Sequence, residues 1–143
     1  MRSFRCEIPV RFGDIDQAGV AYYPTLLSHC HAAFEEFFEQ ALGRPYPQVL
    51  LKDRLGFPTV HLEADFREAL RYGDRLAFEV SVARMGRGSV VFRYRAFRRG
   101  RRGRPRLAFQ VLGTTACVDM RVFRPCALPP KYRRMFARHL RKP

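Results

Sequence analysis

The chain has 143 residues, 47% of them hydrophobic, which is enough for one domain with a buried core, and we expect a single domain over residues 1–143. No stretch approaches the ~18 apolar residues of a membrane span and the first residues lack a signal-peptide pattern, which argues against a membrane partner and favours a cytoplasmic location. The formal net charge of +14, from 27 Lys and Arg against 13 Asp and Glu, should attract anions of any kind and by itself selects no function.

The N-terminal residues 3–11 alternate between apolar and polar side chains, which predicts a strand, and Pro9 favours an edge position. A short loop follows, in which Asp14 and Asp16 stand before Pro24, a residue well suited to open a helix. A helix N-terminus presents unpaired N–H groups and a partial positive charge, so it can stabilise a nearby carboxylate or an oxyanion. The loop is therefore the first candidate for chemistry.

Apolar residues recur at steps of three and four after this loop, which predicts an amphipathic helix running to about Leu42. Its apolar face carries Leu26, Cys30, Ala33, Phe34, Phe37, Phe38, Ala41 and Leu42, and its polar stripe carries Ser28, His31, Glu35 and Glu39. Gly43 supplies a stop signal. A helix this long and rich in Phe needs a sheet to cover it.

Residues 44–57 contain prolines and a glycine and are interpreted as an irregular connection. From residue 58 onward apolar residues alternate with a period of two, and turn residues separate the runs. We expect four antiparallel strands, at 58–67, 76–82, 89–97 and 106–123, the last bent at Gly113, with a basic hairpin tip at 98–105 and a short basic helix over 131–140. The order of one strand, one helix and four strands indicates an α+β fold.

The stretch Phe12-Gly-Asp-Ile-Asp-Gln-Ala-Gly-Val-Ala-Tyr-Tyr-Pro24 resembles the signature of the 4-hydroxybenzoyl-CoA thioesterase family of hotdog-fold proteins. An Asp-x-Asp-x-x-Gly loop that leads into an aromatic-Tyr-Pro helix start is a specific motif, and Gly56-Phe-Pro58 and Tyr72-Gly-Asp-Arg-Leu76 add support. The resemblance implies a hotdog fold, in which an antiparallel five-stranded sheet wraps around one long central helix.

The resemblance also implies an activity, namely hydrolysis of the thioester of an aromatic, 4-hydroxybenzoyl-CoA-like, or short-chain acyl-CoA. It implies a homodimer or homotetramer with sites at subunit interfaces and no cofactor, because coenzyme A is part of the substrate. Residue by residue it suggests Asp16 as the catalytic carboxylate and the Tyr23 N–H as the group that polarises the carbonyl. It further suggests Arg84, Arg87 and Ser89 as CoA-binding residues. We add Gly19, Thr59 and His61 as candidate substrate-binding residues.

The chemistry of the loop leaves two routes open. An ionised Asp16 can attack the thioester directly, or it can orient and deprotonate a water molecule. The structural alternative is that Asp14 and Asp16 only cap a turn and the helix. We assign Asp14 mainly to structure, whereas the flanking Gly19 and Tyr23 favour chemistry at Asp16.

Other polar residues carry weaker hypotheses. His61, Glu63 and Asp65 share one strand face and could line an acyl pocket or hold a metal ion, although a solvated face or a subunit contact is the better interpretation and we expect no metal. His31 and Glu35 stand four residues apart and favour an ion pair. The four cysteines, without a Cys-x-x-Cys spacing, predict reduced and mostly buried thiols: Cys6, Cys30, Cys117 and Cys126.

Two rival functions remain. A hotdog module could bind acyl-CoA or nucleic acid without turnover, with the basic tip 98–106 contacting phosphates, although we expect nucleic acid not to be the partner. A hotdog hydratase or dehydratase would need His31 or His61 aimed at an enoyl thioester.

Overall fold

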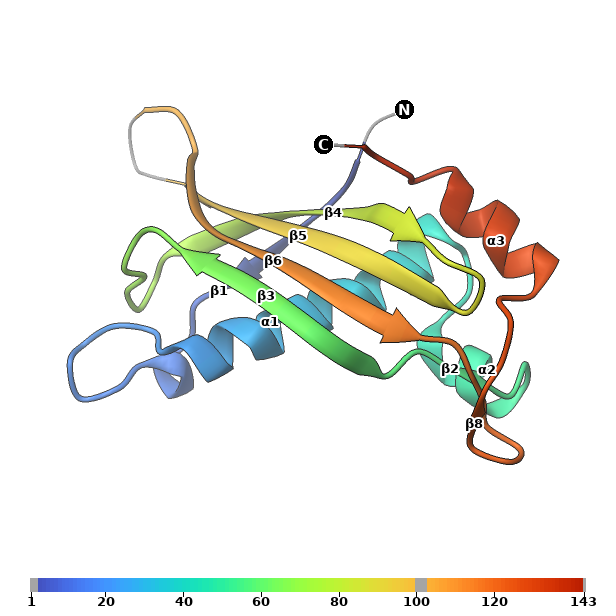
Figure 1. Ribbon diagram of the computed structural model, residues 1–143. Coiled ribbons are helices and arrows are strands. Elements are labelled where there is room, and N and C mark those ends of the chain that lie inside the picture. The colour runs from blue at the N-terminus through green and yellow to red at the C-terminus, as the bar shows by residue number, and fades with distance from the viewer. Residues whose placement is uncertain (1–2, 100–102, 143) are drawn as a thin grey trace.

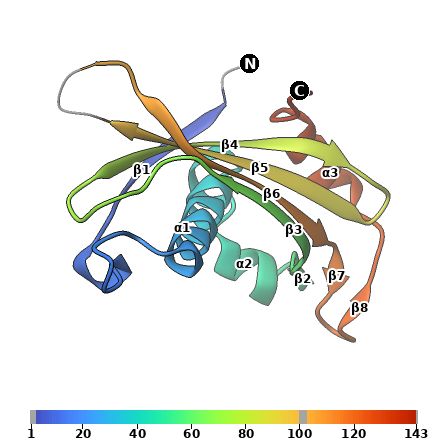
Figure 2. The ribbon, with the colours of Figure 1, turned by 60° about the vertical axis from the view of Figure 1, so that its left-hand side comes forward.

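The computed structural model describes residues 3–99 and 103–142, and in it a curved five-stranded antiparallel sheet covers one long helix, α1 (Figure 1). The strand order is β1-β4-β5-β6-β3. The strands are β1 (Phe4–Pro9), β3 (Thr59–Phe66), β4 (Arg75–Met85), β5 (Ser89–Arg99) and β6 (Arg106–Ala116). This arrangement confirms the expected α+β hotdog fold. Figure 2 shows α1 lying in the hollow of the sheet, with the strands arched over it.

Helix α1 (Tyr23–Glu36) begins at the predicted signal, but its α-helical part ends seven residues before the predicted stop at Gly43. It continues as a π-helical turn, η2 (Phe37–Ala41), in which the Leu42 N–H donates to the Phe37 carbonyl at 3.1 Å. Gly43 then adopts a left-handed φ of 66°, which a side chain would disfavour, and terminates the helix. Phe37 and Phe38, the first two residues of this turn, are both fully buried.

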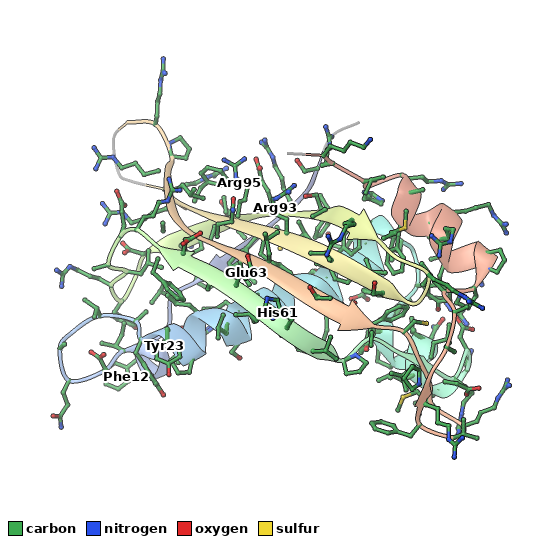
Figure 3. All side chains as sticks on the ribbon, viewed as in Figure 1. Phe12, Tyr23, His61, Glu63, Arg93 and Arg95 are labelled. Atoms are coloured by element: carbon green, nitrogen blue, oxygen red, sulfur yellow. The ribbon has the colours of Figure 1, made fainter. Side chains whose placement is uncertain are left out.

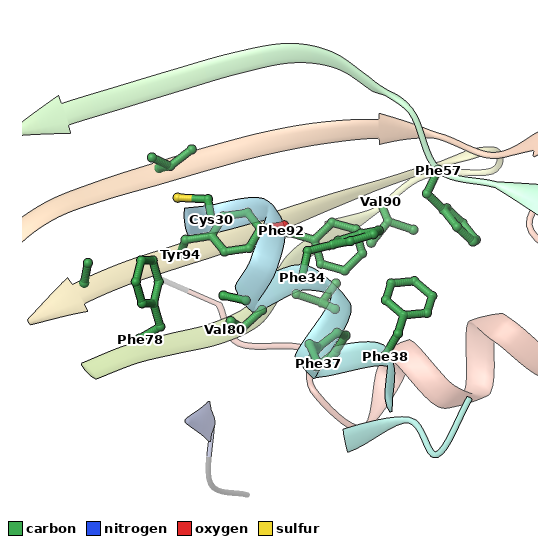
Figure 4. Packing of buried hydrophobic residues seen from close by; sticks show 14 of the residues in the cluster. Cys30, Phe34, Phe37, Phe38, Phe57, Phe78, Val80, Val90, Phe92 and Tyr94 are labelled. Carbon is green, nitrogen blue, oxygen red and sulfur yellow. The ribbon is translucent and has the colours of Figure 1, made fainter. Parts of the chain in front are cut away.

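The core consists of phenylalanines on α1 and η2 packed against the inner faces of β4 and β5 (Figure 4). The ring of Phe38 lies in its centre, with centroid distances of 4.7 Å to Phe34, 5.8 Å to Phe57 and 5.8 Å to Phe136. Edge-to-face and tilted pairs of this kind add to the free energy gained from burial. The predicted apolar face of the helix is therefore the face that packs on the sheet.

The connection after the helix, expected to be irregular, contains α2 (Tyr46–Leu51) and β2 (Leu55–Gly56). Pro45 and Pro47 lie at the N-cap and in the first turn of α2, where the helix uses no backbone N–H donor. The missing N–H of proline therefore does not interrupt the helix. Arg44 and Asp53 flank α2 and form an ion pair of 2.5 Å, and the Tyr132 hydroxyl also donates to Asp53. This network fixes the connection to the C-terminal helix.

The final strand was expected to run to residue 123, and this expectation is wrong. Strand β6 ends at Ala116, and the chain then forms β7 (Val118–Asp119), a turn and β8 (Arg124–Pro125), which make a second sheet in the order β2-β7-β8. The left-handed φ of 54° at Phe123 closes the turn. The C-terminal helix α3 (Pro130–Ala137) is present, somewhat shorter than predicted.

Strand β3 lies at one edge of the sheet, and within residues 3–99 and 103–142 its strand partner is β6 alone. Its apolar side chains stay open to solvent, with Val60 65% and Phe66 45% exposed. An edge strand with free N–H and C=O groups and exposed apolar side chains is a template for pairing with another strand. Strand β1, which contains Pro9, is the other edge, as predicted.

Candidate active site

The Asp16 loop is a short hairpin that starts with the 3₁₀ turn η1 (Phe12–Asp14) and is closed by a bridge between Ile15 and Ala21. The Asp16 N–H donates to the Val20 carbonyl at 3.0 Å, and the Asp16 carbonyl accepts from the Gly19 N–H at 3.0 Å. Gly19 has a left-handed φ of 81°, which explains why the motif has glycine there. These hydrogen bonds and the bridge give the loop a defined conformation.

The Asp16 carboxylate is exposed and accepts one hydrogen bond, from the Ala18 N–H to Oδ1 at 2.8 Å. Among the ion pairs of residues 3–99 and 103–142, none includes Asp16. One carboxylate oxygen thus orients the side chain, and the other stays available for a substrate or a water molecule.

The Asp14 carboxylate has a different role. Its Oδ2 accepts from the Arg11 N–H at 2.8 Å and lies 2.7 Å from Nε2 of His29, and both members of this pair are mostly buried. The Asp14 carbonyl accepts from the Tyr22 N–H at 3.4 Å and from the Thr25 hydroxyl at 3.2 Å. Asp14 therefore fastens the loop to α1. The pairing of His29 with Asp14 was not predicted from the sequence. A polar residue next to a buried position of the helix was a usable signal that His29 needs a partner.

Tyr23 is the first residue of α1 and Tyr22 is its N-cap. In the described part of the chain, no hydrogen bond has the Tyr23 N–H as its donor, as is usual for the first turn of a helix. Tyr23, labelled in Figure 3, is 64% exposed. The centroid of its ring lies 6.5 Å from that of Phe66, the last residue of β3. The helix start, its free N–H and the end of β3 thus lie together.

A cavity of about 230 Å³ lies between α1 and the sheet, next to the start of β3. Its wall is mostly aromatic and apolar, and Thr59 lies at its rim: it is lined by Leu27, Cys30, His31, Phe34, Tyr46, Phe57, Pro58, Thr59, Leu62, Tyr94, Val111 and Gly113. Apolar walls with a few polar groups are typical of ligand sites. Of the predicted substrate-binding residues, the cavity includes Thr59 but not Gly19 or His61.

The predicted CoA-binding residues lie at the turn between β4 and β5, where Arg84 and Arg87 are exposed and Ser89 is half-buried. Ser89 pairs with Ala116, whose N–H donates to the Pro58 carbonyl at 3.0 Å, so this turn and the cavity rim belong to the same end of the sheet. Figure 1 shows the β4–β5 turn and the Asp16 loop at opposite ends of α1. Within one chain, the structure does not bring the predicted catalytic and CoA-binding residues together.

The weaker candidates also have defined places. His61 Nε2 lies 3.2 Å from Glu63 on the exposed strand β3 (Figure 3), and no group of three His, Cys, Asp or Glu in the described ranges is arranged to hold a metal ion. The expected His31–Glu35 ion pair is absent from the ion pairs of the described residues. Instead, the His31 ring stacks on Phe34 with centroids 5.4 Å apart, because the aromatic surface of α1 reaches this position.

The basic tip at 98–106 lies partly outside the described residues, at 100–102, so its suggested role has no structural account. Two arginines at the ends of this segment form ion pairs with Glu68. Nε of Arg98 lies 3.9 Å from Oε2 of Glu68, and Nη1 of Arg106 lies 3.4 Å from Oε1. Across the ranges that the structure describes, no helix has the length and hydropathy needed to cross a bilayer.

A curled five-stranded sheet on one long helix, with an acidic loop at the helix start, defines a hotdog-fold protein of the thioesterase type. The chain belongs to the Thioesterase-like superfamily, whose sequence model matches residues 10–136. The resemblance that the N-terminal motif carries is thereby confirmed.

Individual relatives agree with this family. The chain is 34% identical over 97 residues to the 1,4-dihydroxy-2-naphthoyl-CoA hydrolase of Prochlorococcus marinus (strain MIT 9211), covering 64% of this chain and 64% of that protein. It is 32% identical over 129 residues to the hydrolase of the same name from Prochlorococcus marinus (strain MIT 9303), covering 84% and 80%. The 4-hydroxybenzoyl CoA thioesterase from Pseudomonas sp. strain CBS-3 superimposes with a TM-score of 0.84 at 25% identity, covering 94% and 99%. The family to which the chain belongs thus includes proteins named as acyl-CoA thioester hydrolases.

Proposed function

We propose that the chain hydrolyses the thioester of an aromatic acyl-CoA at a site shared between two protomers. One protomer contributes Asp16 and the Tyr23 N–H, and the other contributes the aromatic cavity and the β4–β5 turn. The observation that supports this arrangement is the edge position of strand β3. The two halves of the site lie at opposite ends of this strand within one chain, and its open edge can pair with the same strand of a second protomer.

The geometry of β3 supports the pairing. From Thr59 to Phe66 the strand spans about 23 Å, so the cavity rim and the Asp16 loop cannot meet within one chain. If two copies of β3 pair antiparallel about their midpoint, Thr59 of one protomer lies opposite Phe66 of the other. Phe66 packs beside Tyr23, at the start of α1. A two-fold pairing therefore places the cavity rim of one protomer near the Asp16 loop of the other, and it would cover Val60 and Phe66.

The proposed chemistry uses groups that are available in the structure. The thioester carbonyl oxygen would accept from the Tyr23 N–H, which stabilises the negative charge that this oxygen gains as the carbonyl is attacked. Asp16 would either attack the carbonyl carbon, giving an anhydride that water then opens, or take a proton from the attacking water. In both routes the C–S bond breaks and CoA leaves as a thiol. The chain's own groups suffice for this reaction, with coenzyme A as part of the substrate.

The remaining site residues would bind the rest of the substrate. An acyl ring fits the cavity because rings of Phe34, Tyr46 and Tyr94 line it. The phosphates of CoA would lie near Arg84 and Arg87, which are exposed at the same end of the sheet. The aromatic lining favours an aromatic over an aliphatic acyl group, in keeping with the naphthoyl and benzoyl thioesters that the named relatives act on.

The proposal is tested by measuring thiol release from a panel of acyl-CoAs. We expect kcat/KM for 1,4-dihydroxy-2-naphthoyl-CoA or 4-hydroxybenzoyl-CoA to exceed that for aliphatic acyl-CoAs by at least about tenfold, the discrimination expected of a shaped apolar pocket. Absence of thiol release across the panel would contradict the proposal. Salt-sensitive binding of RNA or DNA without turnover would favour a binding module instead, and hydration of enoyl-CoA would favour a hydratase.

A further inference from the structure

Two of the four cysteines are close enough to react with each other. The Sγ atoms of Cys117 and Cys126 are 3.5 Å apart, and both residues are free thiols. They lie at the base of the β7–β8 hairpin, one residue outside the paired strands, where the Cys126 N–H donates to the Cys117 carbonyl at 2.9 Å. Residues that stand opposite each other across an antiparallel pair have Cα atoms about 4.5–5.5 Å apart, within the range that a disulfide spans.

The two thiols differ in access. Cys117 is fully buried, whereas Cys126 is half-buried and open to small reagents. Burial, followed by the hydrogen bond to Cys126, raises the pKa of the Cys117 thiol to about 12. The sulfur that a reagent reaches first is therefore that of Cys126, and Cys117 lies behind it. Neither Cys6 nor Cys30 has a thiol contact among the described residues.

The base of this hairpin also supports the β4–β5 turn. The Cys117 N–H donates to the Gly88 carbonyl at 2.8 Å, and the Leu128 N–H donates to the Arg87 carbonyl at 2.8 Å. A Cβ atom at Gly88 would lie only 2.6 Å from the Cys126 carbonyl oxygen, so the turn and Cys126 are in tight contact. A covalent bond between the two sulfurs would thus cross-link the segment on which this turn rests.

We propose that Cys117 and Cys126 form an oxidisable dithiol that closes to an intramolecular disulfide when a low-molecular-weight disulfide is present. The Cys126 sulfur attacks the reagent disulfide, breaks its S–S bond and releases one small thiol, which leaves a mixed disulfide on Cys126. Cys117 then loses its proton, attacks the Cys126 sulfur and releases the second small thiol. Overall, two protein thiols are oxidised and one reagent disulfide is reduced to two thiols.

The sequence alone did not indicate this pair, because the two cysteines are nine residues apart and lack the Cys-x-x-Cys spacing. Only the unexpected hairpin brings them together. A pair that closes and reopens responds to the redox state of its surroundings, which separates it from a permanent structural disulfide.

The test is mass spectrometry of the folded protein after incubation with oxidised glutathione. We expect a loss of two hydrogen atoms, a peptide map that links Cys117 to Cys126, and a melting temperature higher by about 5 °C than that of the reduced protein. The closing step should accelerate between pH 7 and pH 9, because the thiolate fraction of Cys117 rises with pH.

Matched variants separate the pair from the other thiols. Cys126→Ser should abolish both the cross-link and the gain in melting temperature, and Cys117→Ser should stop at a mixed disulfide on Cys126. Cys6→Ser should react as the parent does. A folded parent protein that forms no cross-link, or that links other cysteines, would overturn the inference, whatever the outcome of the hydrolysis assays.

Discussion

Replacement of Asp16 by Asn is expected to lower kcat for the best acyl-CoA substrate by at least about a thousandfold, the scale seen when a catalytic carboxylate is removed. Asn keeps an oxygen that can accept the Ala18 N–H, so the loop conformation should survive. It removes the negative charge and the nucleophile, so neither direct attack nor proton transfer remains efficient. The measurement is thiol release under saturating substrate, together with thermal unfolding, whose midpoint should not change.

Asp14→Asn is the matched control for this variant. Asp14 lies in the same loop, but its carboxylate pairs with His29 and accepts from the Arg11 N–H. Loss of that charge should lower the free energy of unfolding by about 1–3 kcal/mol, since both partners are mostly buried, with a smaller loss of kcat. Hydrolysis by Asp16→Asn at the parental rate would remove Asp16 from the mechanism.

Phe38→Ala is expected to lower the free energy of unfolding by about 3–5 kcal/mol, a large part of the stability of a domain of this size. The Phe38 side chain is fully buried, and its ring contacts aromatic rings from α1, α2, β5 and α3. Truncation therefore leaves a cavity where several elements meet. Urea unfolding followed by circular dichroism measures the change.

The controls for this prediction use a conservative and an exposed site. Phe38→Leu keeps most of the buried volume and should cost clearly less than the alanine variant. Phe123→Ala removes a ring that is 71% exposed and should change stability by less than about 1 kcal/mol. Equal losses for Phe38→Ala and Phe123→Ala would show that the aromatic cluster does not hold the layers together.

The fold was predictable where the information is local. The spacing of Leu26, Cys30 and Phe34 defines the buried face of α1, and alternation defines β3 to β5. The π-helical turn and the β7–β8 hairpin were not predicted. The hairpin depends on tertiary packing, because the chain after Ala116 must turn back to pair with β2. The π turn has no local signal, because the apolar spacing of this segment also fits a regular α-helix.

Some parts of the candidate site could likewise be predicted from local sequence, and others could not. The motif around Asp16 and Tyr23 is contiguous in sequence, so its loop and helix start could be predicted and are present. The His29–Asp14 pair joins residues 15 positions apart, and it depends on how the loop folds back on α1. The distance in space between Asp16 and the residues Thr59 and Arg87 could not be predicted from the sequence. It depends on the direction of the strands and on which strand forms the edge of the sheet.

The most direct test of the shared site mixes two inactive variants. Asp16→Asn disables the catalytic half, and Thr59→Trp should block the exposed rim of the cavity in the other half. After the two chains are unfolded and refolded together at equal amounts, half of the dimers contain one of each, and one of their two sites is intact. We expect about a quarter of the parental activity to return. If heterodimers form, as native mass spectrometry would show, but the mixture stays inactive, the site is not shared between protomers.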